Sequence, residues 1–96
     1  MTAYVIVNLH EITDLEIYEE YARLAGPTIA EHQGKMLILG KDITTIEGSW
    51  TGNQVLIVEF PNRAAFEGWY QSDEYAPLIE MRKNSLIADV IVIDND

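Results

Sequence analysis

The residues best suited to proton-transfer chemistry in this chain are His32 and Glu59. We expect His32 at the end of a helix and Glu59 at the end of a strand, and the inferred topology makes them neighbours. A carboxylate beside an imidazole supports the imidazolium and fixes its tautomer, which produces a general base near neutral pH. Glu59 also follows four apolar residues, where an unpaired charge would be costly. The pattern therefore predicts a catalytic pair, with a structural ion pair or a solvated strand end as the alternative.

A second candidate group centres on the stretch EGWYQSDEYAPL, residues 67–78. Its spacing places Trp69 on the inner side of a helix, so we expect Trp69 to pack in the core. The hydroxyl groups of Tyr70 and Tyr75 need partners if they are buried, and such groups at the rim of a helix–sheet cleft orient small ligands. Structural hydrogen bonding is the alternative for Tyr70, Tyr75 and Arg82. The predicted ligand-binding residues are Tyr70, Tyr75, Arg82 and Trp50.

Other kinds of site lack their sequence signatures. The chain has no cysteine, and its two histidines are far apart without metal-ligand spacing, so we predict no metal and no cofactor. A G-x-S-x-G elbow and a glycine-rich phosphate loop are both missing, which excludes serine hydrolase chemistry and phosphate cradling. His10 follows a strand and precedes a helix cap, so we expect a loop histidine.

The charge balance limits the partners that the protein can take. Six basic and sixteen acidic side chains give a net charge of −10, which repels phosphate backbones and anionic membranes. We therefore predict no nucleic-acid and no membrane partner. The amino end lacks the basic region of a signal peptide and no segment approaches the length of a membrane span. We expect one soluble, cytoplasmic domain over residues 1–96.

The elements that position these residues follow from hydrophobic periodicity. Residues 3–9 are β-branched and aromatic, which predicts a strand. An amphipathic helix follows, with Thr13 or Asp14 as its N-cap. The Gly26–Pro27 pair should kink or break this helix, because proline removes an amide donor and crowds the preceding turn. A further short helical run then ends at Gly34.

The rest of the chain begins with a hairpin. Residues 35–48 predict a long second strand, with a bulge or bend at Gly40 and Lys41. A short polar turn joins it to the third strand. The remaining elements are the third strand at 54–60, a helix at about 63–71, a helical stretch capped by Ser72 that ends near Asn84, and a fourth strand at 85–93.

The element order β-α-β-β-α-β is the ferredoxin-like arrangement of the α+β class. Right-handed crossovers place the first and third strands centrally in a four-stranded antiparallel sheet, with the helices on one face. The strands nevertheless carry apolar residues on both faces, whereas a half-exposed sheet should alternate apolar and polar residues. We therefore predict a homodimer in which a second copy covers the other face by sheet-on-sheet packing.

Several motifs resemble an uncharacterised family. The chain is similar to the DUF1330 family of the dimeric α+β barrel superfamily in the runs AYVIVN, TDLEIYEEY, GPTIAEHQGKMLILG, IEGSW and VLIVEFPNRAAFEGWYQSDEY, and in Arg82. The resemblance covers nearly the whole chain and is most specific at residues 59–75. It implies a ferredoxin-like fold and a dimeric α+β barrel. The chain departs from the pattern at Gln33, where glycine is usual, and at Asp73, where proline is usual.

Two hypotheses of function follow. In the first, a small organic molecule binds in a helix–sheet cleft, and the protein is a cofactor-independent enzyme that performs proton transfer or oxygenation. In the second, the dimer is not catalytic and binds a metabolite or a protein partner. The family resemblance implies no agreed activity, so the sequence leaves both hypotheses open.

Overall fold

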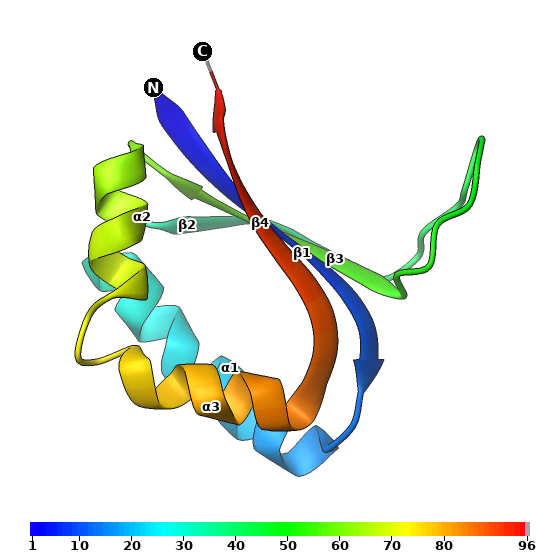
Figure 1. The fold of residues 1–96 in the computed structure, drawn as a ribbon, viewed down its shortest axis with the longest axis horizontal. Coiled ribbons are helices and arrows are strands. Elements are labelled where there is room, and N and C mark those ends of the chain that lie inside the picture. The colour runs from blue at the N-terminus through cyan, green and yellow to red at the C-terminus, as the bar shows by residue number, and fades with distance from the viewer. Residues whose placement is uncertain (96) are drawn as a thin grey trace.

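The structure, a computed structural model, describes residues 1–95, which form a four-stranded sheet with three helices on one face (Figure 1). The elements follow the predicted order, with the second helical region divided into two helices. Their bounds are β1 Thr2–Ile12, α1 Leu15–Glu31, β2 Lys35–Gly40, β3 Gln54–Phe60, α2 Arg63–Tyr70, α3 Ala76–Ser85 and β4 Leu86–Asn95.

The sheet is antiparallel with the strand order β2-β3-β1-β4, so β1 and β3 are central as predicted. Its inner face carries apolar side chains, which pack against the helices. Ala3 and Val5 of β1 lie opposite Phe60 and Val58 of β3, and all four are buried. Because side chains alternate along a strand, the residues between them point to the outer face.

Among residues 1–95, no layer covers the outer face of the sheet, and a row of apolar side chains crosses this face. Register places Ile38, Ile57, Ile6 and Ile91 side by side on the four strands, and we call this set the isoleucine row. Ile38 and Ile91, on the two edge strands, are 47% and 51% exposed. The prediction that both faces of the sheet carry apolar residues is therefore confirmed. In the single chain, the outer face is exposed to solvent.

The predicted second strand at 35–48 is too long. β2 ends at Gly40, and residues 41–53 leave the sheet as an arm that projects well beyond the body of the molecule (Figure 1). None of the described strands pairs with this arm, and Ile43, Ile46 and Trp50 on it are exposed. The apolar alternation in DITTIEG suggested a strand, but strand structure requires a pairing partner as well as suitable residues.

The first helix is not broken at Gly26 and Pro27. Instead, α1 continues through both residues to Glu31, and the Asp14 side chain caps its first turn by accepting a hydrogen bond from the Ile17 amide. Pro27 and Arg23, four positions earlier, are both exposed. The carbonyl that loses its partner to proline is thus on the solvent side, where water can hydrogen-bond it.

Three local predictions also need correction. Gly34 is not the left-handed terminating residue of α1, because Gln33 has that conformation with φ 65° while the Gly34 amide bonds Ile29 O. Ser72 caps a short turn rather than a helix, since α3 begins at Ala76. The first strand runs to Ile12, so His10 lies in a strand, at a register shift, and not in a loop.

No helix within residues 1–95 has the length and apolar character needed to cross a membrane.

Candidate functional site

An apolar cavity of about 260 Å³ lies between the inner face of the sheet and the helices. Val5 and Val58 contribute to its sheet side, α1 contributes Tyr21 and Ala25, and α2 contributes Trp69. Apolar cavities of roughly 150 Å³ already accept a molecule the size of benzene. The space therefore suits a small organic molecule with one or two rings.

Aromatic side chains build the helical wall of this cavity. The ring centroids of Trp69 and Tyr75 are 4.1 Å apart, and Tyr70 stacks on Phe66 at 5.7 Å. Trp69 is buried in the core, as predicted, and its indole N–H donates a hydrogen bond to Thr28 Oγ1 at 3.0 Å. Because this bond satisfies the only polar atom of the ring, Trp69 presents a fully apolar surface to the cavity.

One end of the cavity is polar. The hydroxyl groups of Tyr21 and Tyr75 are 2.8 Å apart, and Arg82 Nη1 donates a hydrogen bond to Tyr75 Oη at 3.1 Å. Two helices and a turn meet here, because Tyr21 comes from α1, Tyr75 ends the turn before α3 and Arg82 lies two turns along α3. The structure thus brings together the predicted residues Tyr70, Tyr75 and Arg82 in the lining of one cavity.

The two tyrosine hydroxyls are neutral over the physiological pH range. Burial raises the pKa of Tyr21 far above its ordinary value, and the nearby Tyr75 raises it further. Burial also raises the pKa of Tyr75. Neither side chain can therefore neutralise the positive charge of Arg82 by becoming a phenolate.

The short turn between α2 and α3 positions Tyr75. Ser72 Oγ donates to the Trp69 carbonyl at 2.8 Å and accepts from the Tyr75 amide at 3.2 Å. The turn thereby ties the end of α2 to the start of α3. It holds Tyr75, which is fully buried, beside Trp69 and Tyr21.

The predicted pair of His32 and Glu59 does not form. His32, just after α1, lies in a shallow depression with Asn62 and Gly68 on the helical side, and its Nδ1 is 3.0 Å from Thr28 O. Glu59 lies between inward-facing Val58 and Phe60, so its side chain points to the outer face. The topology placed both residues at one end of the domain, but strand alternation separates them by the thickness of the sheet.

Trp50 is also separate from the cavity. It lies on the arm and is 50% exposed. Tyr21, which supplies one hydroxyl of the polar end, was not predicted from the sequence. Tyr21 lies three residues after Tyr18 and four before Ala25, so all three lie on one face of the helix. This spacing could have identified Tyr21 as a residue of the cavity.

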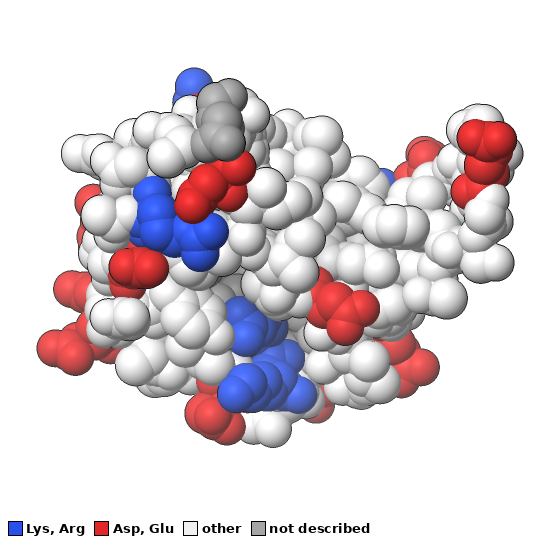
Figure 2. Space-filling model, turned by 45° about the horizontal axis from the view of Figure 1, so that its top comes forward, with Lys and Arg blue, Asp and Glu red and all other residues white. Residues whose placement is uncertain are grey.

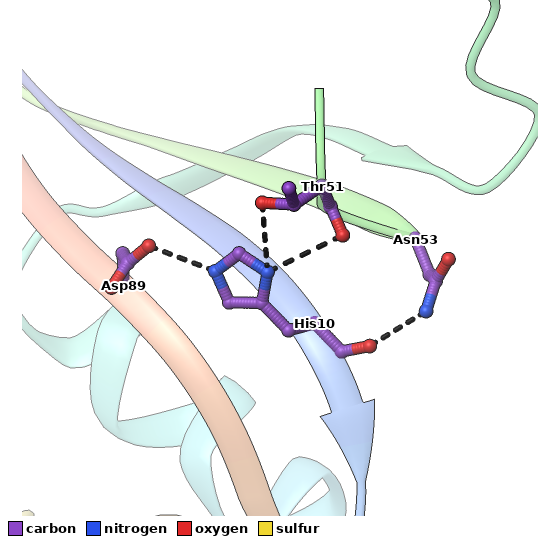
Figure 3. A network of polar contacts seen from close by, with 4 residues as sticks. All are labelled: His10, Thr51, Asn53 and Asp89. Atoms are coloured by element: carbon purple, nitrogen blue, oxygen red, sulfur yellow. Dashed lines mark hydrogen bonds and ion pairs between the residues drawn. The ribbon is translucent and has the colours of Figure 1, made fainter. Parts of the chain in front are cut away.

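A second polar cluster lies on the outer side of the sheet, around His10 (Figure 3). Its Nε2 is 2.8 Å from Asp89 Oδ2, while its Nδ1 is 3.3 Å from both the carbonyl and the hydroxyl oxygen of Thr51. Asn53 donates to the His10 carbonyl. The hydrogen bond with Asp89, followed by that with Thr51, raises the pKa of His10. This cluster joins the base of the arm to β1 and β4.

Within residues 1–95, no group of three histidine, cysteine, aspartate or glutamate side chains is arranged to hold a metal ion.

Comparison with known families identifies the chain. The profile described as "Domain of unknown function (DUF1330)" matches residues 2–96. The chain belongs to the DUF1330 family. A search of curated proteins gives no significant match.

Solved structures with the same fold support the architecture. The RPA0582 protein of unknown function from Rhodopseudomonas palustris has a TM-score of 0.80 at 19% identity, over 96% of this chain and 80% of that one. A dimeric ferredoxin-like protein of unknown function from Jannaschia sp. CCS1 has a TM-score of 0.78 at 13% identity, over 99% and 100%. SnoaB, a cofactor-independent oxygenase from Streptomyces nogalater, has a TM-score of 0.62 at 10% identity, over 99% and 91%. These similarities confirm the predicted ferredoxin-like α+β fold.

Proposed function

We propose that this DUF1330 protein is a homodimer that binds a small organic molecule in the cavity between its sheet and helices. The observation that carries the proposal is the apolar cavity of about 260 Å³ with a polar group at one end. A pocket that is mostly apolar, with a few convergent polar groups, is the usual form of a small-molecule site.

The two faces of the sheet have separate roles in this proposal. The inner face and the helices enclose the ligand, and the isoleucine row on the outer face meets the same row of a second copy. Exposed apolar patches of this extent mark interaction surfaces, and a self-complementary patch suits a two-fold dimer. The fold is shared with the dimeric ferredoxin-like protein from Jannaschia sp. CCS1, which is consistent with this mode of assembly.

Cofactor-independent oxygenation or proton transfer is the second candidate function. It is favoured by the fold shared with SnoaB, which is a cofactor-independent oxygenase. The polar groups that line the described cavity, however, are tyrosine hydroxyls and a guanidinium, so they suit orientation of a ligand better than abstraction of a proton. Binding therefore ranks first, and His32 and Glu59 are not assigned a joint role.

The two tryptophans provide a direct test with an internal control. Trp69 lines the cavity and Trp50 lies on the arm, so each gives one indole N–H signal in a ¹H–¹⁵N NMR spectrum. Titration with indole, a small apolar probe, should shift the Trp69 signal and leave the Trp50 signal in place. A Trp50→Phe variant assigns the two signals. A shift of Trp50 alone, or of neither signal, would contradict the proposed site.

A substitution at the mouth of the cavity gives a second readout. Gly26 lines the cavity and has nothing within 4 Å of the position where a Cβ would lie, so Gly26→Leu should fit and obstruct the space. Replacing a helical glycine also favours the helix, so loss of folding is not expected. Ala30→Leu, exposed on the same helix, is the matched control. The Ala30→Leu variant should bind indole as wild type does. The affinity of the Gly26→Leu variant for indole should be at least tenfold lower than that of wild type.

A further inference from the structure

Arg82 has no acidic partner in the described structure, although the chain carries sixteen acidic residues. The ion pairs within residues 1–95 join His10 to Asp89, Arg23 to Glu20 and Arg63 to Asp94. Arg82 instead donates to the neutral hydroxyl of Tyr75 and lies partly buried at the edge of the cavity. A guanidinium that is partly removed from water without a counter-ion is costly, so an anion that replaced this lost solvation would be bound favourably.

The tyrosines beside Arg82 offer a further donor. Tyr21 and Tyr75 have two hydroxyl protons between them, and the bond between their oxygens uses one. Whichever hydroxyl donates, this bond leaves the proton of the other hydroxyl unused. The polar end of the cavity therefore combines the remaining N–H groups of Arg82 with a free O–H, and all of these are donors.

We infer that the ligand of this cavity is a small apolar carboxylate, with its carboxylate on Arg82 and the tyrosine pair and its apolar body against Trp69. The inference rests on the proposed binding function and adds the chemical class of the ligand. A carboxylate is favoured because its two oxygens match the planar fork of a guanidinium. The lining of the cavity beyond Arg82 and the tyrosines is apolar, so the rest of the molecule is uncharged.

Two probes of nearly the same shape separate charge from shape. Indole-3-carboxylate and indole-3-carboxamide differ chiefly in the negative charge, and isothermal titration measures the affinity of the protein for each. Wild-type protein should bind the carboxylate at least tenfold more tightly than the amide. Equal affinities would overturn the carboxylate inference and leave the ligand cavity intact. Failure of both probes to bind would instead contradict the cavity as a ligand site.

Variants of α3 attribute the preference to Arg82. Arg82→Gln should bring the ratio of the two affinities close to one, with binding of the amide changed less than threefold. Lys83→Gln removes the same charge from the exposed neighbouring residue and should keep the preference. Arg82→Lys, which retains the charge but not the fork, should give an intermediate ratio and provides a readout if Arg82→Gln does not fold. A preference that persists in Arg82→Gln would overturn the assignment.

Discussion

At the scale of single residues, the hydroxyl of Thr28 fixes the main wall of the cavity. It accepts from the indole of Trp69 at 3.0 Å and donates to the Ala25 carbonyl at 2.7 Å. Thr28→Val keeps the shape of the side chain but leaves the buried indole N–H without an acceptor. An unsatisfied buried donor costs about 1–3 kcal/mol, so the free energy of unfolding should fall by about this amount in urea titrations. Thr28→Ser retains the hydroxyl, so its free energy of unfolding should fall by less than that of Thr28→Val. If Thr28→Val were as stable as wild type, the hydrogen bond to Trp69 would not contribute to stability.

The His10–Asp89 pair predicts a pH dependence of stability on the outer face. Because folding raises the pKa of His10, the pair stabilises the protein fully below the unfolded value of 6.5 and loses this effect as the pH rises through the folded value. The melting temperature of wild type should therefore exceed that of Asp89→Asn most at pH 6, and the difference should shrink by pH 8. NMR titration of the His10 ring should also show a lower pKa in Asp89→Asn. An unchanged pKa would contradict the role of this carboxylate.

The candidate residues show what sequence could and could not predict at this scale. Tyr70, Tyr75 and Arg82 line one cavity, and the sequence indicated them by their polar groups on otherwise apolar helical segments. His32 and Glu59 do not come together, because one residue of strand register decides the face on which a side chain lies. The His10–Asp89 contact spans 79 positions, and only the pairing of β1 with β4 could reveal it.

At the scale of elements, the end of α1 carries a residue in an unfavourable conformation. Gln33 has a φ of 65°, which lies in the left-handed region. Residues other than glycine, asparagine and aspartate are disfavoured in this region. Gln33→Gly should therefore raise the free energy of unfolding by about 0.5–1 kcal/mol in urea titrations, after the entropy cost of glycine. Gln71→Gly is a matched control, because Gln71 ends α2 with φ −97° and gains nothing from glycine. Equal effects of the two substitutions would contradict this explanation.

The elements themselves were predictable where local signals and packing agree. Hydrophobic periodicity, the cap at Thr13 or Asp14 and the turn residues predicted the order of the elements and the two central strands correctly. The failures lie where the environment outweighs local preference. The predicted alternative of a break at Pro27 does not occur, because the missing bond of Pro27 faces solvent. Residues 41–53 leave the sheet because β3 begins only at Gln54 and offers them no partner.

At the scale of the whole molecule, the chain exposes more surface than its mass requires. Its accessible surface is 6163 Å², whereas a monomer of 10.9 kDa is expected to expose about 5,600 Å². The molecule is flat, with extents of 36 × 35 × 15 Å, and the arm projects from it. Acidic side chains are spread over the visible surface and reach the tip of the arm, while basic ones form a few small groups (Figure 2). This shape is consistent with a subunit that buries its outer face against a copy of itself.

The proposed dimer predicts a clear effect of charge on the outer face. Ile91 lies in the isoleucine row, so Ile91→Asp would place a carboxylate inside the interface and should produce monomers. Sedimentation equilibrium at micromolar concentration should give twice 10.9 kDa for wild type and close to 10.9 kDa for this variant. Ala64 on α2 is exposed, so Ala64→Asp adds the same charge away from the interface. This variant should remain a dimer. A folded, monomeric wild type would rule out the interface.

The binding of a small apolar carboxylate between sheet and helices is tested most directly by a crystal structure of the protein with indole-3-carboxylate. We predict ring density against Trp69 inside the cavity, with the carboxylate oxygens within hydrogen-bonding distance of Arg82. Density for the probe only on the outer face of the sheet, or in the cavity with its carboxylate turned away from Arg82, would contradict this prediction.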